Sequence, residues 1–391
     1  MPKFKVVKDG PKDIKSKIAA IRERLGLRGI IIAVIVLIAI LLGIFLFLNR
    51  RFSDYDVIES QTSGANASVR FTSFSKGILR SSNDGVSYLK DNFETQWTQG
   101  FNMQKALIDI SGDYAVAVDS GGTDIYLFNK DGFVKKIEVN YGVEQIRVSA
   151  KGNVFAITAS KDKRYMKYYN SNGDLIAEGM VQLKKTGYPV NFDISDDGRL
   201  LMMSYLYVSN GISKTNVSFY NFDEAGKTEI DRIVASYEYD NAIIPEVKFF
   251  GNDTAVAIGD SSAYIFTGAS KPALQKTIEF DKEVQSVFYD NDKIGIVFAN
   301  PGEENPYKVQ VYKPGGSKTV DIGIDIDYSD ICFAGENILA YNGNQCKLYS
   351  ELGFCRFDYS FDNRIYQIAP VSGGARYVLV TGDEAKVIKL K

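Results

Sequence analysis

The sequence predicts an all-β fold, a β-propeller with eight blades favoured and seven as the alternative, behind one N-terminal transmembrane helix. Three observations carry this prediction. An apolar run occupies residues 29–48, a hairpin pattern recurs with a period of about 43 residues over most of the remaining chain, and the composition favours strands and turns. The 391 residues include 24 Tyr, 24 Phe and 34 Gly but only 9 Pro, which argues against a disordered stalk.

The apolar run, residues 29–48, contains no charged, amide or hydroxyl side chain. Twenty residues at about 1.5 Å each give a helix of roughly 30 Å, which matches the hydrocarbon core of a bilayer. A helix also satisfies its own backbone hydrogen bonds in lipid. We therefore expect residues 29–48 to cross a membrane, with the preceding tail and the rest of the chain on opposite sides.

The tail, residues 1–28, sets the expected orientation. It carries nine basic and three acidic residues, a net charge of +6, and an excess of basic residues marks the cytoplasmic side. A cleaved signal peptide is the alternative, but its apolar core would be about 7 to 15 residues long and end in a small-residue cleavage site. The segment FLFLNRRFSD contains no such site. We expect a single-pass protein of the cell membrane with a cytoplasmic N-terminus and an extracytoplasmic propeller.

Within this tail, apolar residues recur every three or four positions after Asp13, as in an amphipathic helix with basic residues elsewhere around it. Such a helix lies on anionic headgroups, so we expect it to contact the inner leaflet. A docking site for a cytoplasmic partner is the alternative. The basic residues expected at the leaflet are Lys15, Lys17, Arg22, Arg24 and Arg28.

The remaining chain has 37 basic and 45 acidic residues, a net charge of −8, which makes nucleic acid an unsuitable partner. The absence of His removes Ser-His-Asp and Cys-His catalysis and His-ligated zinc. Three cysteines, Cys332, Cys346 and Cys355, are too few for a disulfide scaffold and wrongly spaced for a metal knuckle. One disulfide is conceivable, but buried thiols are favoured because three cysteines cannot all pair. No cofactor, metal or catalytic residue is predicted.

The repeat is clearest in hairpins such as IYLFNKDGFVKKIEV, KYYNSNGDLIAEG and KLYSELGFCRFDY. In each, a strand ends in a large apolar residue, a polar turn follows, and a second strand begins. Two further apolar strands precede each hairpin, so one unit supplies the four strands of a propeller blade. The strand-ending residues align at spacings of 39, 41, 51, 46, 46, 37 and 41, and they are Leu89, Phe128, Tyr169, Tyr220, Phe266, Tyr312, Tyr349 and Leu390.

Ring closure needs a strand from the start of the chain, because the last unit ends at Lys391 without a fourth strand. Residues 49–67 form a linker in which Tyr55–Glu59 has strand character, and this segment is expected to complete the last blade. The propeller would then span residues 68–391 with eight blades. Seven blades would result if residues 69–74 closed the ring instead. A WD40 propeller is disfavoured, since the Gly-His and Trp-Asp pairs are missing from the expected places.

The run GYPVNFDISDDGRLLMMSYLYVSNGISKTNVSFYNF (residues 187–222), the preceding YYNSNGDLIAEG, the basic tail and the single span together carry a resemblance. The chain resembles an uncharacterised family of membrane-anchored, quinoprotein-like propellers in Gram-positive bacteria, a domain of unknown function. The resemblance covers nearly the whole chain. It implies the propeller and the anchor, but no activity and no site residue.

The fourth unit is the longest, and its excess lies in SYLYVSNGISKTNVSFY, which reads as a protruding hairpin. Tyrosines on such a loop often anchor a partner, but tyrosines in strands also pack, and packing is the favoured explanation for any single one of them. The candidate partner-binding residues are Tyr205, Tyr207, Tyr237 and Tyr239.

Two acidic segments are weaker candidate sites. The loop ANPGEENPYK (residues 299–308) would form an acidic lip or a solvated hairpin end, and the second is favoured. In DIGIDIDYSD, the residues Asp321, Asp325 and Asp327 share one side of an extended strand, with Asp330 after them. Calcium would need loop carbonyls as well, so a polar outer strand is the favoured explanation.

The favoured functional hypothesis is a non-enzymatic binding or scaffold module at the cell envelope. Its partners would be the membrane, an envelope or membrane protein, a glycan or a small ligand, and the propeller would be monomeric. One alternative is a glycan-cleaving or quinone-dependent enzyme with its site in the central funnel. Another is a membrane sensor or assembly subunit that uses the basic tail.

Overall fold

The structure is a computed structural model that describes residues 29, 31–43, 45–46, 49–62, 69–181, 183–371, 376–382 and 384–391. The chain divides into two compact units, Met1–Arg51 and Phe52–Lys391. In the first unit, residues 31–43 are helical. Across the described residues, no helix is both long enough and apolar enough to cross a membrane. The basic residues Lys15, Lys17, Arg22, Arg24 and Arg28 lie outside the described residues.

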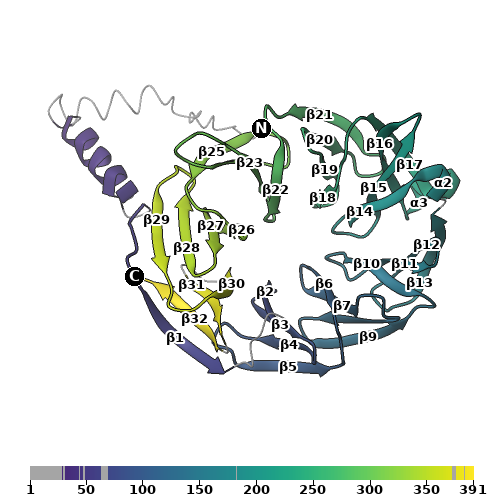
Figure 1. Ribbon diagram of the computed structural model, residues 1–391, viewed down its shortest axis with the longest axis horizontal. Helices are drawn as coiled ribbons and strands as arrows, with labels where there is room; N and C mark the ends of the chain where they lie inside the picture. The colour runs from purple at the N-terminus through teal and green to yellow at the C-terminus, as the bar shows by residue number, and fades with distance from the viewer. Residues whose placement is uncertain are drawn as a thin grey trace, which may run out of the picture. The chain divides into compact units, whose positions relative to one another are not determined.

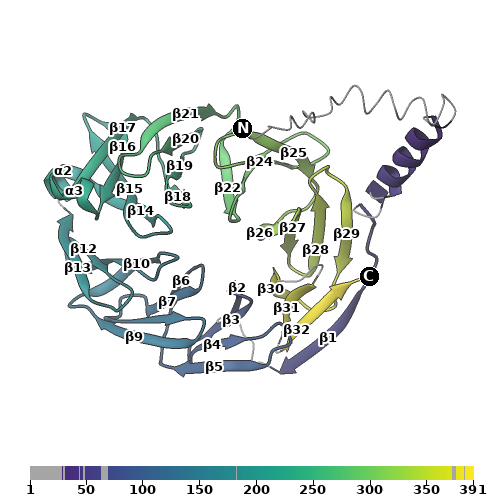
Figure 2. The same ribbon diagram turned by 180° about the vertical axis from the view of Figure 1, so that it is seen from behind.

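The second unit is a ring of antiparallel four-stranded sheets, and the described residues form eight of them. Figures 1 and 2 show the ring from its two sides, with the first strand of each sheet nearest the centre and the fourth at the rim. The prediction of an all-β propeller with eight blades is confirmed, and the seven-bladed alternative is wrong.

The first four blades follow one another along the chain. The first consists of β2 (Arg70–Phe74), β3 (Gly77–Ser82), β4 (Gly85–Leu89) and β5 (Thr95–Gly100). The second consists of β6 (Ala106–Ser111), β7 (Tyr114–Asp119), β8 (Asp124–Asn129) and β9 (Gly132–Glu138). The third consists of β10 (Gly142–Val148), β11 (Val154–Ser160), β12 (Lys163–Tyr169) and β13 (Leu175–Val181). The fourth consists of β14 (Tyr188–Ile194), β15 (Leu200–Ser209), β16 (Ile212–Asn221) and β17 (Ile233–Asp240).

The next three blades repeat this order. The fifth consists of β18 (Glu246–Phe250), β19 (Thr254–Ile258), β20 (Ser262–Thr267) and β21 (Ala273–Glu279). The sixth consists of β22 (Val284–Tyr289), β23 (Ile294–Ala299), β24 (Tyr307–Tyr312) and β25 (Lys318–Ile324). The seventh consists of β26 (Asp330–Ala334), β27 (Asn337–Asn342), β28 (Gln345–Ser350) and β29 (Cys355–Ser360).

The eighth blade joins the two ends of the propeller. Its inner strands are β30 (Ile365–Pro370), β31 (Arg376–Thr381) and β32 (Glu384–Leu390), and its outer strand is β1 (Tyr55–Thr62). The strand β1 pairs antiparallel with β32, from Tyr55 opposite Leu390 to Thr62 opposite Glu384. The segment expected to close the ring therefore does so, and it extends three residues beyond Glu59. Closure in this way covers the edge of β32, so only the short, protected edges of a propeller remain.

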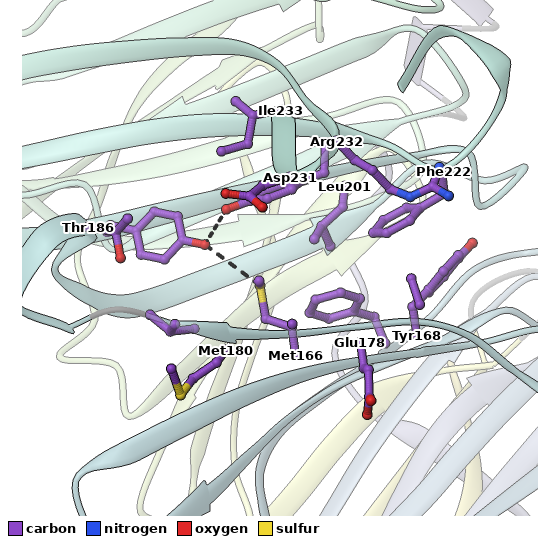
Figure 3. A pocket seen from close by; sticks show the side chains of 16 residues that line it. Met166, Tyr168, Glu178, Met180, Thr186, Leu201, Phe222, Asp231, Arg232 and Ile233 are labelled. Atoms are coloured by element: carbon purple, nitrogen blue, oxygen red, sulfur yellow. Dashed lines mark hydrogen bonds between the residues drawn. The ribbon is translucent and has the colours of Figure 1, made fainter. Parts of the chain in front are cut away.

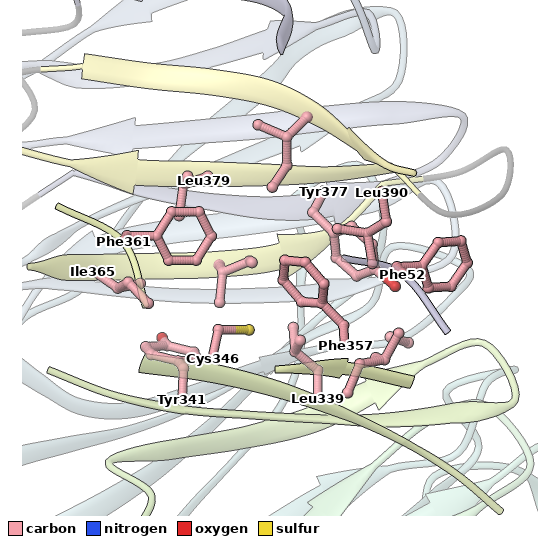
Figure 4. Packing of buried hydrophobic residues seen from close by; sticks show 14 residues of the cluster. Phe52, Leu339, Tyr341, Cys346, Phe357, Phe361, Ile365, Tyr377, Leu379 and Leu390 are labelled. Atoms are coloured by element: carbon pink, nitrogen blue, oxygen red, sulfur yellow. The ribbon is translucent and has the colours of Figure 1, made fainter. Parts of the chain in front are cut away.

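Apolar residues fill the interfaces between neighbouring blades, and the described residues form one buried cluster for each interface. Figure 4 shows the cluster between the seventh and eighth blades, where Leu339 and Phe357 face Leu379 and Leu390. Phe52 joins this cluster, and its backbone N–H donates to the carbonyl of Arg356 at 2.6 Å. The interface thus holds the first residue of the propeller unit in place.

The aligned residues of the repeat mark one structural feature, a register shift between the third and fourth strands of a blade. In the first seven blades, the shift falls directly before the aligned residue. A bulge of this kind bends the strand and re-aims the side chain. All of the aligned residues are buried, namely Leu89, Phe128, Tyr169, Tyr220, Phe266, Tyr312, Tyr349 and Leu390.

The three cysteines, all within the described ranges, are free thiols. Cys346 is fully buried in the interface between the seventh and eighth blades, and Cys332 packs beside it. Burial raises the pKa of the Cys332 thiol to about 12. The conceivable disulfide is absent, and the thiols act as small apolar side chains.

Candidate functional site

A cavity of about 440 Å³ opens between the third and fourth blades. We call it the blade 3–4 pocket. Its walls come from β11, β12 and β13 on one side and from β15, β16 and the start of β17 on the other. Figure 3 shows Met166 and Met180 facing Leu201 and Ile233 across it. The pocket therefore opens within a blade interface, whereas packed side chains fill the interface between the seventh and eighth blades.

Small residues on β13 explain why this interface stays open. Ala177 and Gly179 occupy the inward-facing positions of the strand, paired with Tyr168 and Met166 of β12. The equivalent positions of the seventh blade carry Phe357 and Tyr359. Two large aromatic rings are therefore replaced by a methyl group and a hydrogen. A Cβ atom on Gly179 would approach the Met166 methyl to 3.1 Å, so Met166 packs directly against the bare backbone of Gly179.

Aromatic rings form one wall of the pocket. Tyr168 and Phe222 stack with their ring centroids 4.2 Å apart and their planes at 28°. Phe155 packs against Tyr168 from beneath, at 6.1 Å. These contacts fix a flat apolar surface suited to a ligand with an apolar body.

A pair of buried tyrosines forms the deeper wall. The hydroxyls of Tyr205 and Tyr220 lie 2.5 Å apart, and the Tyr205 hydroxyl also donates to the Met166 sulfur at 3.8 Å. Burial raises the pKa of Tyr220 to about 12. Both hydroxyls therefore stay protonated and satisfy one another, so this wall presents little unmet hydrogen-bonding capacity to a ligand.

The connection from β16 to β17 places an arginine at the pocket. It contains the short helix α3 (Glu224–Lys227) and the 3₁₀ turn η1 (Ile230–Arg232). Asp231 and Arg232 both adopt positive φ angles, 54° and 60°, which are rare for residues with a side chain. Backbone strain of this kind tends to gather at functional sites.

The guanidinium of Arg232 is the unusual polar group of this pocket. Its central carbon lies 6.0 Å from the centre of the Phe222 ring, and Figure 3 shows the two side by side. The Nη1 atom is buried, and no described residue accepts a hydrogen bond from it. A buried N–H group without an acceptor costs about 1–3 kcal/mol. The half-buried side chain of Arg232 therefore places a charged group, with one buried and unpaired nitrogen, beside the apolar surface of the pocket.

The four tyrosines proposed from the sequence have different positions. Tyr205 is buried in the pocket wall. Tyr207 is half-buried, and its hydroxyl donates to the carboxylate of Glu238. Tyr237 and Tyr239 pack in the interface between the fourth and fifth blades. The structure thus brings Tyr205 to the pocket and leaves the other three outside it.

The long hairpin expected in the fourth unit is observed. Its strands β15 and β16 are ten residues each, against six for β7 and β8 of the second blade. Val208 near the tip has 71% of its surface exposed.

The sequence did not reveal Arg232, Ala177 or Gly179 as site residues. The available signals were two small residues within a strand and the eleven-residue insertion after Asn221, but neither indicates a cavity without its partner blade.

The central channel is the second candidate site, a cavity of about 990 Å³ lined mainly by the first strands of successive blades. Charged residues of alternating sign occupy it, with Asp109, Arg147, Asp193 and Lys248 on β6, β10, β14 and β18. Lys248 lies 3.1 Å from the Asp193 carboxylate. The backbone N–H of Phe249 also donates to Asp193, at 2.8 Å. These charges therefore bind neighbouring blades to one another.

Burial raises the pKa of Asp109 to about 6, while the charge of Arg147 acts in the opposite direction. Its carboxylate already accepts the N–H of Val148 at 2.7 Å. A carboxylate with such a pKa suits acid–base chemistry, but structural ion pairs perturb pKa values as well. The contacts of Asp109 and Asp193 favour the structural role.

The acidic segment of β25 and its following loop is paired internally. Asp321 lies 2.9 Å from Lys308, and Asp325 lies 2.8 Å from Lys347. Asp327 and Asp330 accept hydrogen bonds from Tyr307 and Tyr341. Over the described ranges, no group of three acidic or thiol side chains is placed to hold a metal ion. In the loop of residues 299–308, the side chain of Asn300 donates to the carbonyl of Asn305 at 2.9 Å.

Comparison with protein families gives one match. The model of the Family of unknown function (DUF5711) matches residues 48–390. The chain belongs to this family. The resemblance drawn from the sequence is thus confirmed for a propeller family without an assigned function.

This DUF5711 chain is similar to several solved structures. It aligns with BamB from Moraxella catarrhalis at 12% identity and a TM-score of 0.52, covering 86% of this chain and 100% of BamB. It aligns with Sqt1 from Saccharomyces cerevisiae at 8% identity and a TM-score of 0.54, covering 88% and 99%. Sqt1 from Chaetomium thermophilum gives 9% identity and a TM-score of 0.50, covering 87% and 97%.

No curated protein matches the DUF5711 chain. Identities of 8–12% to the solved structures establish the propeller fold alone. A function for this DUF5711 chain must therefore be argued from the blade 3–4 pocket and the central channel.

Proposed function

We propose that the protein is a membrane-anchored, extracytoplasmic binding module at the envelope of a Gram-positive cell, and that the blade 3–4 pocket is its recognition site. One observation carries the proposal: a cavity of about 440 Å³ is lined by Arg232, whose buried Nη1 atom no described residue pairs. Cavities of this size hold small ligands, and a few polar groups among apolar walls orient them. The apolar walls and the mutually hydrogen-bonded hydroxyls of Tyr205 and Tyr220 favour binding over catalysis.

The anchor is proposed from the sequence. Residues 29–48 would cross the membrane, with residues 1–28 in the cytoplasm, a linker at 49–67 that includes β1, and the propeller at 68–391. Phe52 is the first residue held in the propeller, so three residues separate it from the apolar run. A tether this short would keep the propeller near the membrane, where it would meet its ligand. The propeller would act as a monomer.

An envelope protein or a glycan remains a proposed partner for a second surface, the tip of the β15–β16 hairpin, where Val208 is exposed. Tyr207 lies on the same strand. A role as a sensor or assembly subunit would add cytoplasmic contacts through the basic tail.

The binding function is tested by photo-crosslinking in intact cells. A photoreactive residue replaces Met180, which lies at the pocket and is 48% exposed, or Leu274, which is 40% exposed on β21 of the fifth blade. We expect a discrete adduct by mass spectrometry at position 180 and none at 274. The additional substitution Ala177→Phe, which fills the pocket, should abolish the adduct. Equal labelling at both positions, or labelling unaffected by Ala177→Phe, would overturn the proposal.

Two further measurements test the remaining parts. Protease added to protoplasts should digest the chain after residue 48, and protection of the propeller would contradict the proposed orientation. Turnover of a glycan or an alcohol by the purified protein, lost in Asp109→Asn or Asp193→Asn, would replace the binding function by an enzyme in the central channel.

A further inference from the structure

We infer that the blade 3–4 pocket binds a small molecule that joins one carboxylate to an apolar body. This inference rests on the proposed function, because it names the ligand class of the same pocket. It has three supports: the apolar lining, the unpaired guanidinium, and the charge balance at the pocket.

The lining of the blade 3–4 pocket indicates that the ligand has an apolar body. Phe155, Tyr168 and Phe222 supply a rigid aromatic surface, and Leu201 faces it from the fourth blade. Met166 adds a thioether side chain, which adapts to ligands of irregular shape. A ligand that buries several methylene groups or one ring here gains roughly 0.8 kcal/mol for each methylene group removed from water.

The guanidinium of Arg232 indicates which polar group the ligand carries. Arg232 is always charged, and its planar fork matches the two oxygens of a carboxylate. Its Nη1 atom is buried without an acceptor among the described residues. A carboxylate in the pocket would supply an acceptor for the exposed part of this half-buried guanidinium, and a charge-assisted hydrogen bond is strong in low-dielectric surroundings. An uncharged ligand would leave the guanidinium without an ion-pair partner. The structure therefore favours a carboxylic acid over an alcohol with the same apolar body.

The neighbouring charges limit the ligand to one negative charge. Asp231 is exposed next to Arg232 in the chain and also lines the pocket, so the two residues bring opposite charges to it. Glu178 also lines the pocket, but Lys167 pairs with it. The pocket is therefore close to neutral before a ligand enters. A phosphate would bring about two negative charges toward Asp231, whereas a carboxylate brings one.

Two sources would supply such a carboxylate, a free acyl chain or the C-terminus of an apolar peptide. Two matched pairs of probes separate them. Octanoate and 1-octanol share an eight-carbon chain, and N-acetylphenylalanine and N-acetylphenylalaninamide share a peptide-like body. Within each pair, only the first member carries the carboxylate.

The readout is site-specific. Methionine methyl groups are labelled with ¹³C in the full-length protein in lipid nanodiscs, and the four probes are titrated in turn. Met166 and Met180 line the pocket, while Met103 is buried between the first and second blades and reports non-specific effects. We expect the carboxylate of at least one pair to shift the signals of Met166 and Met180, but not that of Met103. Its affinity should exceed that of its neutral partner about tenfold.

Variants assign this preference to the arginine. Arg232→Met should remove the difference between acid and neutral partner, while Arg232→Lys, which keeps the charge, should retain part of it. Arg199→Met is the matched control, since Arg199 pairs with Asp197 outside the pocket, and it should behave like the wild type. If Arg232→Met does not fold, the Arg232→Lys variant still tests the inference, because lysine keeps the charge on a side chain of similar length.

The outcomes are distinct. Equal binding of acid and neutral partners, with shifts at Met166 and Met180, would overturn the carboxylate inference and leave the pocket as a binding site. A preference that persists in Arg232→Met would overturn it as well. If none of the four probes shifts Met166 or Met180, or if Met103 shifts equally, both the inference and the pocket assignment fail.

Discussion

The carboxylate of Asp109 accepts a 2.7 Å hydrogen bond from the backbone N–H of Val148, which joins the first strands of the second and third blades. Asp193 repeats the contact with Phe249 between the fourth and fifth blades, at 2.8 Å. Gln367 forms its neutral equivalent, donating to and accepting from the backbone of Phe71 between the eighth and first blades. Inner strands of neighbouring blades are thus connected through side chains, and this connection has consequences for stability.

Asp109→Asn should change the pH dependence of stability. The pKa of Asp109 is raised from 3.8 to about 6 by burial, so between these values the folded state holds a proton that the unfolded state has lost. The free energy of unfolding of the wild type therefore contains a penalty that is absent below about pH 4, grows up to about pH 6 and is constant above it. A shift of this size corresponds to at most about 3 kcal/mol, and channel water reduces it.

The amide oxygen of the Asp109→Asn side chain would still accept the Val148 N–H, but the side chain would carry no charge. We expect the stability of Asp109→Asn relative to wild type to rise from pH 4 to pH 6 and then level off, measured by urea unfolding at pH 4, 5, 6, 7 and 8. Asp113→Asn, which replaces an exposed carboxylate at the same channel, is the control and should show no such rise. A flat difference across this range would contradict the prediction.

Tyr205→Phe should destabilise the protein by about 1–3 kcal/mol, because it leaves the Tyr220 hydroxyl buried without its partner. Tyr220→Phe should act similarly. The double variant removes both hydroxyls, so its loss should be smaller than the sum of the single losses by about 1 kcal/mol. Urea unfolding measures all three. Tyr207→Phe, whose hydroxyl lies at the surface, should change stability by less than about 0.5 kcal/mol. Additive losses would show that the two hydroxyls are not coupled.

Leu390→Ala should weaken ring closure. The side chain is 2% exposed and packs with Phe52 between the last two blades, and truncation of such a side chain costs about 2–5 kcal/mol. Lys389→Ala, at the exposed neighbouring position, should cost less than about 0.5 kcal/mol. Chemical unfolding followed by tyrosine fluorescence compares them. Equal losses would mean that the last strand does not secure the ring.

The cysteines should react slowly in the folded protein. Burial raises the pKa values of Cys332, Cys346 and Cys355, so little reactive thiolate is present at pH 8. We expect iodoacetamide to modify them at least tenfold faster in urea than in buffer, measured by mass spectrometry. Ser270→Cys places a thiol at an exposed position and should react quickly in the folded state. Fast native modification of all three thiols would contradict their burial.

The periodic features of the propeller could be predicted from the sequence because they are local. Each aligned residue, from Leu89 to Tyr349, ends a third strand at a bulge and is buried there, so the same environment recurs once per blade. The closing strand was predictable for a related reason. A ring must pair its last strand, and the segment from Tyr55 was the strand-like stretch left over near the start of the chain.

The candidate site required the tertiary structure, because it depends on residues from two blades. Ala177 and Gly179 look like weak strand residues in the sequence, and they create a cavity only because the facing blade does not fill it. Arg232 reads as an ordinary charge in a polar turn, and its burial follows from the path of the insertion that ends at β17. Packing was the favoured interpretation of Tyr205, and the hairpin does bury it at its base, but only the facing blade places it in the wall of a pocket.

The local patterns of the sequence thus predicted the blade repeat and the closing strand and favoured eight blades over seven, since alternation, turn chemistry and buried strand ends act over a few neighbouring residues. Contacts between the third and fourth blades determine where the ring is incompletely packed, and they bring the charge of Arg232 to that pocket. Cavity volume and the burial of a charge are sums over contacts between segments distant in sequence, and no local pattern encodes them.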